Sequence, residues 1–406
     1  MGLVDSRTGL PVVGMVGAGQ LARMTHQAAV ALGQSLRVLA RGPVEPAALV
    51  ACEVVVGRPD DLAVLRRFAE GCDAVTFDHE HVPTEHLRAL VADGVQVYPG
   101  PDALAHAQDK LLMRQTLAGL GMPVPPFREV TELQDVLCFC VQHGWPCVLK
   151  AIRGGYDGRG VWRLDAPSHA RRVVTEQLAA GTPLLVEPYV AMRRELAALV
   201  ARSPFGQGAA WPVVQTVQQD GICVEVLAPA PGLDPTLALA AQELALRVAF
   251  ELGVVGVLAV ELFEMPGGQL LVNELAMRPH NSGHWTIEGA VTSQFEQHLR
   301  AVLDYPLGSA TPRAPICVMA NVLAADTAPV MGIDERLHHL MARYPEAKVH
   351  LYAKPERPRR KIGHVTVLGA LPASVRGMAQ ASATFLATGT WPDGYPVHGR
   401  NGRRRD

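Results

Sequence analysis

The segment Leu271–His284, LVNELAMRPHNSGH, places a series of polar side chains directly after a strand-like apolar run. They include Glu274, Arg278, His280, Asn281, Ser282 and His284. Carboxylate, guanidinium, imidazole and amide groups in one short stretch can bind a metal ion, a phosphate or an acidic substrate. The segment is therefore the first candidate for a functional site.

A second glutamate is predicted to lie across from Glu274 in the run GVLAVELFEMPGGQLLVNEL. Two apolar strands flank Gly267 and Gly268, a pair suited to a two-residue hairpin turn, and counting outward from that turn places Glu261 opposite Glu274. Two bare carboxylates this close repel, so the pair indicates bound Mg²⁺ or Mn²⁺. The alternative is a looser turn that keeps the glutamates apart. Asn273 faces the other way in a regular strand and needs a bulge to reach the site.

A glycine-rich loop lies between two predicted strands in CVLKAIRGGYDGRGVWRL. It lacks the G-x-x-x-x-G-K-[ST] pattern of a P-loop, yet the N–H groups of such a loop can close over phosphates. Lys150, Arg153 and Arg159 supply positive charge beside it. The alternative is an ordinary flexible hairpin.

The metal clamp, the phosphate loop and the lysines together indicate ATP. The extended run Val186–Val190, VEPYV, offers backbone groups for adenine, and Glu195 is a candidate for the ribose hydroxyls.

A different glycine turn, Gly17-x-Gly19-x-x-Ala22, follows the first predicted strand and opens a helix. It matches the dinucleotide fingerprint, but no acid follows where an NAD enzyme needs one. Arg41 would suit the 2′-phosphate of NADP. A tight turn for helix packing and a grip on a substrate phosphate are the other two interpretations.

The elements that position these groups alternate between strand and helix up to about Gly100, which predicts a parallel α/β sheet. One helix is expected over PDALAHAQDKLLMRQTLAGLG, followed by a proline-rich joint. A small α/β unit is expected from Arg128 to about Val190, and a further sheet from Glu195 to about Gly308. The last part holds two strand regions and a helix.

Composition excludes several classes of protein. The 406 residues carry a formal net charge of -2, which argues against a general nucleic-acid binder. No apolar run is long enough to span a bilayer, and the first residues lack a secretion signal. The seven cysteines are irregularly spaced, so a disulfide frame or a structural zinc site is not expected and a reducing cytoplasm is.

The chain resembles the ATP-grasp enzymes, and among them the N5-carboxyaminoimidazole ribonucleotide synthetase family of purine biosynthesis. The resemblance runs in family order from about Gly14 to His364, and its longest part is the block RPHNSGH…TSQFEQHLRA. The other matching segments are GMVGAGQLARM, FDHEHVP, VLKAIRGGYDGRG, VEPYV…REL, GVLAVELF and KPERPRRKIGH.

The resemblance implies an α/β fold of the ATP-grasp type and a ligase. Its parts would be an N-terminal Rossmann-like parallel domain (1–105), an ATP-grasp domain of α+β type (106–312) with a central lid subdomain at about 126–190, and a small C-terminal extension (313–406). The implied reaction uses ATP and bicarbonate to carboxylate 5-aminoimidazole ribonucleotide through carboxyphosphate, giving ADP and phosphate. A homodimer is implied, with no nucleic-acid or membrane partner.

The resemblance also assigns roles to individual residues. The catalytic group would comprise Lys150, Arg278, His280 and Asn281. ATP would contact Lys110, Lys150, Gly155, Tyr156, Asp157, Gly158, Arg159, Gly160, Val161, Glu187, Pro188, Tyr189, Val190, Glu195, Gln218, Asn273 and Glu274. Mg²⁺ would be held by Glu261 and Glu274. The other substrates would contact Gly19, Gln20, Asp157, Arg278, His280, Asn281, Ser282, Lys354 and Arg360.

The sequence departs from the family pattern at four positions. Lys110 replaces an arginine near ATP, which keeps the charge but loses a bidentate fork. Gln215 and Gln218 stand where glutamate and histidine are usual, and Met277 replaces a proline. The two glutamine changes leave nucleotide affinity open more than the chemistry.

Three other functions remain as alternatives: a different ATP-grasp carboxylate–amine ligase, a non-catalytic nucleotide-binding subunit, and a metal-dependent hydrolase. For the hydrolase, His79 and His81 have a spacing used for zinc or iron, but no further ligand set follows.

Overall fold

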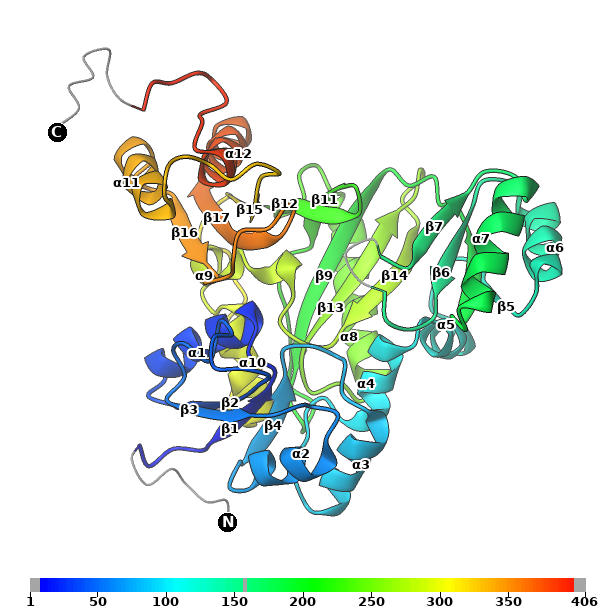
Figure 1. The fold of residues 1–406 in the computed structure, drawn as a ribbon, viewed down its shortest axis with the longest axis horizontal. Coiled ribbons are helices and arrows are strands. Elements are labelled where there is room, and N and C mark those ends of the chain that lie inside the picture. The colour runs from blue at the N-terminus through cyan, green and yellow to red at the C-terminus, as the bar shows by residue number, and fades with distance from the viewer. Residues whose placement is uncertain (1–7, 156–158, 398–406) are drawn as a thin grey trace.

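The computed structural model describes residues 8–155 and 159–397. Three sheets organise the chain, and Figure 1 shows the N-terminal sheet, the lid and the C-terminal elements arranged around the long strands of the central one. Tyr156, Asp157 and Gly158, which were expected to contact ATP or substrate, lie outside the described residues.

The N-terminal sheet is parallel, as the alternating pattern predicts, in the order β3-β2-β1-β4. Its strands are β1 (Val13–Val16), β2 (Leu36–Ala40), β3 (Glu53–Val56) and β4 (Ala74–Phe77). Its helices are α1 (Gln20–Ala31), α2 (Leu62–Ala69) and α3 (Thr84–Ala92). The strand expected near Val97 is only a single bridge to Val75. The carboxyl ends of β1 and β4, parallel neighbours, therefore bring the first glycine turn beside the segment after Phe77.

The single helix expected before the proline-rich joint is two helices, α4 (Pro101–Gln108) and α5 (Lys110–Gly119). The break is at Asp109, whose side chain accepts a hydrogen bond from the N–H of Leu112 and caps α5. This cap makes Lys110 the first residue of α5.

The lid is an antiparallel sheet in the order β5-β8-β6-β7 with two helices packed on it (Figure 1). Its elements are β5 (Arg128–Val130), α6 (Leu133–His143), β6 (Cys147–Ala151), β7 (Val161–Leu164), α7 (Pro167–Ala179) and β8 (Leu184–Pro188). Strands β6 and β7 pair antiparallel on either side of the glycine-rich loop, as predicted. Lys150, at the end of β6, is thereby placed next to that loop.

The central sheet has the order β14-β13-β9-β11-β12-β15-β17-β16, with β10 paired to β9. Its first strands are β9 (Arg194–Arg202), β10 (Gly208–Ala210), β11 (Val214–Gln219), β12 (Ile222–Ala228), β13 (Gly256–Glu264) and β14 (Leu270–Ala276). The helical elements that follow or intervene are α8 (Pro235–Glu251), η1 (Asn281–Gly283), α9 (Thr286–Gly289) and α10 (Gln294–Val302).

The C-terminal strands extend this same sheet. They are β15 (Ile316–Leu323), β16 (Lys348–Leu351) and β17 (Lys361–Gly369), with the helices α11 (Ile333–Arg343) and α12 (Pro372–Thr388). The boundary expected at residue 312 therefore divides one continuous sheet, although α11 and α12 enclose a core cluster of their own with these strands. Among the helices of the described residues, none combines the length and the apolar character needed to span a lipid bilayer.

Candidate active site

The two glutamates of the β13–β14 hairpin lie directly opposite each other. Glu261 pairs with Glu274, whereas the next pair toward the turn is Leu262 with Val272. The turn is closed by the Met265 N–H donating to the Gln269 carbonyl, which leaves three residues in the loop instead of the expected two. The register shift then restores the predicted pairing. The predicted opposition of Glu261 and Glu274 is confirmed. The simple hairpin used to predict it is wrong in two respects, because the loop has three residues and the strand pairing shifts by one residue.

Asn273 is the extra residue at this register shift, so it is the bulge that the sequence argument required. Its side-chain oxygen accepts a hydrogen bond from the Lys150 ammonium at 3.2 Å. Its backbone carbonyl accepts another from Arg114 at 2.8 Å. Without the bulge, period-two alternation would turn Asn273 away from the face that carries Glu274.

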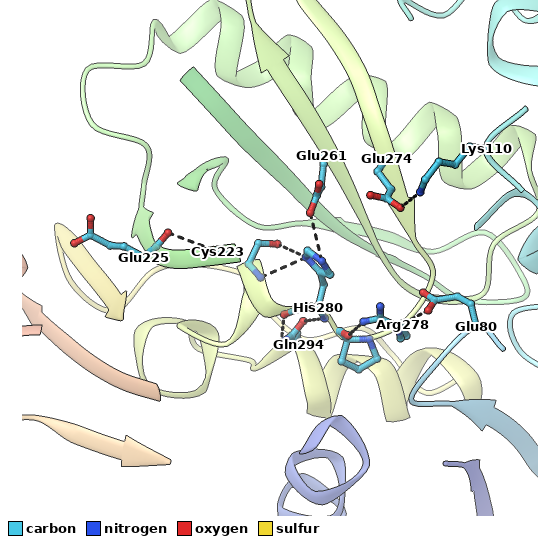
Figure 2. A network of polar contacts seen from close by, with 11 residues as sticks. Glu80, Lys110, Cys223, Glu225, Glu261, Glu274, Arg278, His280 and Gln294 are labelled. Atoms are coloured by element: carbon cyan, nitrogen blue, oxygen red, sulfur yellow. Dashed lines mark hydrogen bonds and ion pairs between the residues drawn. The ribbon is translucent and has the colours of Figure 1, made fainter. Parts of the chain in front are cut away.

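The carboxylate pair is electrostatically unfavourable without a cation. Burial, the charge of Glu274 and the charge of Glu195 all raise the pKa of Glu261. Figure 2 shows Lys110 bound to Glu274 and the His280 ring directed toward Glu261. His280 Nε2 lies 3.5 Å from a Glu261 oxygen. Two carboxylates with an amide oxygen beside them fit a hard divalent cation such as Mg²⁺. The described residues contain no group of three His, Cys, Asp or Glu able to hold a metal, so phosphate or water oxygens would have to complete its ligands.

A buried ionic trio lies beside the clamp. Glu187 accepts from Arg114 Nε at 2.5 Å and pairs with Lys150 Nζ at 2.6 Å. Although burial by itself raises the pKa of Glu187, the charges of Lys150 and Arg114 outweigh it and hold the pKa at about 2. The Glu187 carboxylate is thus committed to the trio, so the adenine contact expected of Glu187 stays a prediction for its backbone groups. Sequence reasoning missed Arg114; its signal is the i,i+4 spacing from Lys110 on one helix.

The segment after β14 is held by a glutamine on α10. The Gln294 side chain accepts from the His280 N–H at 2.8 Å and donates to the His280 carbonyl at 2.8 Å. His280 Nδ1 lies 2.9 Å from Ser282 Oγ. Burial, followed by the charges of Arg278 and Lys361, lowers the pKa of His280 to about 3, so its ring is neutral at physiological pH. The position of Gln294 in the resembling block was its only sequence signal.

Arg278 and Asn281 complete this side of the site. Arg278 Nε donates to Glu80 Oε2 at 2.8 Å, an ion pair that joins the central sheet to the N-terminal domain (Figure 2). Asn281 Nδ2 is buried without a hydrogen-bond partner among the described residues. A buried donor of this kind is costly unless a ligand satisfies it.

The first glycine turn binds an internal carboxylate. The Gly19 N–H donates to Asp78, and a Cβ on Gly17 would lie 1.8 Å from Asp78 Oδ1. Burial raises the pKa of Asp78 to about 6 against the lowering effects of Gly19, Arg278 and Lys354. The Gly19 N–H is used in this way by Asp78 and Gly19 does not line the cleft described below, so its expected contact with a substrate stays a prediction. Because the Asp78 carboxylate lies against this turn, the turn gives no support to the interpretation that it binds NADP.

One cleft of about 970 Å³ brings most of the predicted residues together. Those that line it are Gln20, Lys110, Lys150, Gly155, Arg159, Val161, Glu187, Pro188, Tyr189, Val190, Glu195, Gln218, Glu261, Asn273, Glu274, Arg278, His280, Asn281, Ser282 and His284. Gly160, Lys354 and Arg360 are not among the lining residues. The Lys354 ammonium does donate to the side chain of Gln20, which lines the cleft. Arg360 Nη1 donates to the Pro355 carbonyl at 3.5 Å, a contact at the outer limit of a hydrogen bond.

The four departures from the family pattern fall into two groups, those that line the cleft and those that do not. Gln218 lines the cleft and hydrogen-bonds Glu195. Gln215 instead accepts from Arg194 Nη1 at 3.3 Å and does not line the cleft. Met277 is a buried core residue. Only Lys110 and Gln218 can therefore change nucleotide contacts directly.

His79 and His81 stack with ring centroids 5.7 Å apart, and the described residues offer no third metal ligand beside them.

Three family models match consecutive parts of the chain. The ribonucleotide synthetase preATP-grasp domain matches residues 10–108, the ATP-grasp domain residues 115–295, and the phosphoribosylaminoimidazole carboxylase C-terminal domain residues 317–377. Among curated relatives, the N5-carboxyaminoimidazole ribonucleotide synthase of Mycobacterium tuberculosis is 62% identical over 388 residues, covering 96% of this chain and 90% of the relative.

Solved structures agree with these matches. The N5-carboxyaminoimidazole ribonucleotide synthetase of Thermus thermophilus is 38% identical, with a TM-score of 0.82 over 94% of this chain and 99% of the other. The synthase of Aspergillus clavatus, solved with ADP and 5-aminoimidazole ribonucleotide, is 31% identical, with a TM-score of 0.83 over 93% and 98%.

Proposed function

The chain belongs to the N5-carboxyaminoimidazole ribonucleotide synthase family of ATP-grasp ligases, and from this membership we propose how its cleft works. The protein is a ligase of purine biosynthesis that uses ATP to carboxylate 5-aminoimidazole ribonucleotide with bicarbonate. The products are N5-carboxyaminoimidazole ribonucleotide, ADP and phosphate. The residue roles that follow are our proposals.

ATP binds between the lid and the central sheet. Lys150 is held in place by Glu187 and Asn273, so its ammonium is preorganised for a phosphate oxygen. Gly155 and Arg159, the described residues of the glycine-rich loop that line the cleft, contact the phosphates. Backbone groups of Pro188–Val190 bind adenine, and Glu195 accepts from the ribose hydroxyls with Gln218 beside it.

Glu261 and Glu274 would hold Mg²⁺ or Mn²⁺, with the side-chain oxygen of Asn273 nearby. When bound, the cation neutralises charge on the phosphates as the terminal phosphoryl group is transferred. The raised pKa of Glu261 supports this role. Burial and the neighbouring carboxylates disfavour the ionised form of Glu261, and a bound cation would stabilise that form.

The reaction end of the cleft contains Arg278, His280 and Asn281. Bicarbonate is a poor electrophile, so its oxygen first attacks the γ-phosphorus to give carboxyphosphate and ADP. Arg278 and Lys150 stabilise the charge that gathers in this step. The ring amine then attacks the activated carbon, phosphate leaves, and the amine loses a proton. In neutral His280, Nδ1 accepts from the Ser282 N–H, so Nε2 can donate a hydrogen bond to a reactant, and Asn281 Nδ2 can donate another.

The phosphate of the ribonucleotide binds near Lys354, Arg360 and Gln20. The hydrogen bond from Lys354 to Gln20 supports this placement, because it brings the C-terminal segment to a residue that lines the cleft. We also infer a homodimer in the cytoplasm, as the family resemblance implies.

The opposition of Glu261 and Glu274 at the bulge of Asn273 carries the proposal. The test is phosphate release from ATP in the presence of bicarbonate and Mg²⁺, with and without the ribonucleotide. We expect release to depend on the ribonucleotide. Release that ignores it, or that responds only to a different amine, would favour another carboxylate–amine ligase. No release, together with ATP binding, would favour a non-catalytic nucleotide-binding subunit.

A further inference from the structure

Tyr352 is a buried residue directly after β16, and it has been given no role in the reaction so far. Its ring packs with Leu21 and Met24 of α1 and with Phe295 of α10 in a small core cluster of their own. Its N–H donates to the Ile362 carbonyl at 2.9 Å. The tyrosine ring therefore lies where the N-terminal domain, α10 and the C-terminal strands meet.

The hydroxyl of this tyrosine is held by a buried histidine. The Tyr352 oxygen lies 2.7 Å from His364 Nδ1. Burial raises the pKa of Tyr352 and lowers the pKa of His364, so both groups are neutral at physiological pH. The His364 ring stacks on that of His350 with centroids 4.6 Å apart, and His350 Nε2 lies 2.7 Å from Glu288 Oε1. This chain of contacts fixes the rotation of the tyrosine ring.

The ammonium group of Lys354 lies over the face of the same ring. It is 5.8 Å from the ring centroid, inside the distance of about 6 Å at which an aromatic face attracts a cation. The ammonium also donates to the side chain of Gln20, the first residue of α1. Because Leu21 and Met24 of α1 pack on the tyrosine, the ring and the helix that carries Gln20 together define where the ammonium lies.

The backbone between the tyrosine and the lysine is strained. Ala353 has a φ of 55°, a left-handed conformation in which a Cβ crowds the backbone. Non-glycine residues in this region persist only where their surroundings hold them, and they cluster at functional sites. Here the holding contacts are the burial of Tyr352 on one side and the bond from Lys354 to Gln20 on the other. The strain therefore accompanies a fixed placement of the lysine relative to the ring.

We propose that Tyr352 is a positioning residue of the ribonucleotide site: its ring face holds the Lys354 ammonium in place for the phosphate of the ribonucleotide, and its bond to His364 keeps the ring in place. The inference rests on the proposed function, which gives Lys354 its phosphate. A long lysine side chain loses rotamer freedom when it binds an anion, and a ring that already holds the ammonium reduces that loss. Tyr352 is buried and acts only through Lys354.

Steady-state kinetics of Tyr352→Leu and Tyr352→Phe separate the ring from the hydroxyl. Leucine removes the aromatic face, so we expect the KM for the ribonucleotide to rise by about tenfold while the KM for ATP stays within about twofold. Phenylalanine keeps the face and loses only the bond to His364, so its KM should rise by about threefold or less. Tyr344→Leu is the matched control. Tyr344 also has a cation over its ring, Arg343 at 5.0 Å, but it does not line the cleft and its loss should change neither KM.

Double variants with Lys354→Ala distinguish positioning from a merely structural role. If Tyr352 acts through Lys354, Tyr352→Leu should change the ribonucleotide KM of Lys354→Ala by no more than about twofold, because the ammonium that the ring holds is already absent. If the tyrosine only stabilises the fold, the effects of the two substitutions add.

A second pair of variants keeps the shape of the ring and serves if Tyr352→Leu does not fold. Tyr352→Phe and Tyr352→pentafluorophenylalanine place rings of similar shape at this position, but fluorine withdraws electrons from the ring face and removes its attraction for a cation. We expect the fluorinated ring to raise the ribonucleotide KM by about threefold or more relative to phenylalanine. This difference should vanish in the Lys354→Ala background.

Equal ribonucleotide KM values for the two rings, or additive effects of the Tyr352 and Lys354 substitutions, would overturn the inference. An equal rise in the KM for ATP would do the same. An unchanged ribonucleotide KM in Lys354→Ala would overturn the proposed phosphate site and the inference with it. Wild-type protein without ribonucleotide-dependent turnover would overturn the proposed function as a whole.

Discussion

The ammonium group of Lys110 binds the carboxylate of Glu274, the residue directly opposite Glu261. One member of the carboxylate pair is thus neutralised by a lysine at the start of α5, while the other is half-buried and has a raised pKa. Lys110 contributes to the site as a counter-ion of the clamp, which a single point charge can do as well as an arginine.

Replacing Glu274 by glutamine should abolish Mg²⁺-dependent turnover without unfolding the protein. The change removes one of the two carboxylates that hold the cation, so we expect kcat to fall by about a hundredfold or more. Phosphate release across a Mg²⁺ titration measures this effect. Glu129→Gln, an exposed position on the lid strand β5, is the control. Near-normal turnover of Glu274→Gln would refute the clamp.

The stability of the metal-free protein should depend on pH through Glu261. Between its ordinary pKa of about 4.5 and its raised value, the folded state holds a proton that the unfolded chain has lost. The free energy of unfolding therefore falls as the pH rises through this window. Glu261→Gln removes this contribution, so we expect its stability relative to the wild type to increase with pH.

Urea denaturation of both proteins in a chelator, from about pH 5 to about pH 8, measures the difference. Adding Mg²⁺ and an ATP analogue should stabilise the wild type more at high pH than at low pH. A difference between the two proteins that is independent of pH would contradict this account of Glu261.

Arg114 should be needed for stability as well as for nucleotide binding. Arg114→Leu leaves the buried Glu187 carboxylate with Lys150 as its only remaining partner in the trio. Breaking a buried pair by removing one partner costs about 3–5 kcal/mol. Arg88→Leu, which breaks an ion pair exposed on both sides, should leave the unfolding midpoint unchanged. Equal effects of the two substitutions would show that the trio contributes no more than a surface pair.

Lys354→Ala should mainly raise the KM for the ribonucleotide. The substitution removes a positive charge from the expected phosphate end and the hydrogen bond to Gln20. Lys348→Ala, exposed on the neighbouring strand β16, controls for loss of a lysine from the same region. If only the KM for ATP changed, Lys354 would not bind the phosphate of the ribonucleotide, and its proposed placement would be wrong.

Local patterns in the sequence were sufficient to predict the elements that position the site. The glycines between apolar strands indicated the β13–β14 hairpin, and the clustered glycines after Lys150 indicated the β6–β7 loop. The break at Asp109 carried a visible helix-capping signal that the prediction did not use. The bulge at Asn273 was predicted only conditionally, as a requirement for Asn273 to reach the site. Alternation of side chains along a strand does not show where an extra residue is accommodated.

Partners of the predicted residues could not be derived from local pattern. Arg114 meets Glu187, and Glu80 meets Arg278, across sequence separations of 73 and 198 residues. Such pairs depend on how the sheets pack against one another. The glycine turn shows the same limit: its spacing fits an anion, but only the neighbouring strand reveals that the anion is the carboxylate of Asp78.

The most direct test of the account follows oxygen from bicarbonate. When bicarbonate attacks the terminal phosphorus of ATP, the attacking oxygen remains on that phosphorus after the carbon is transferred to the amine. With ¹⁸O-labelled bicarbonate, Mg²⁺, ATP and the ribonucleotide, the account predicts one ¹⁸O atom in each phosphate released, and none above background with Glu274→Gln. Phosphate whose added oxygen comes from the solvent and not from bicarbonate would contradict it, because ATP would then be hydrolysed by water and bicarbonate would not be activated in this cleft.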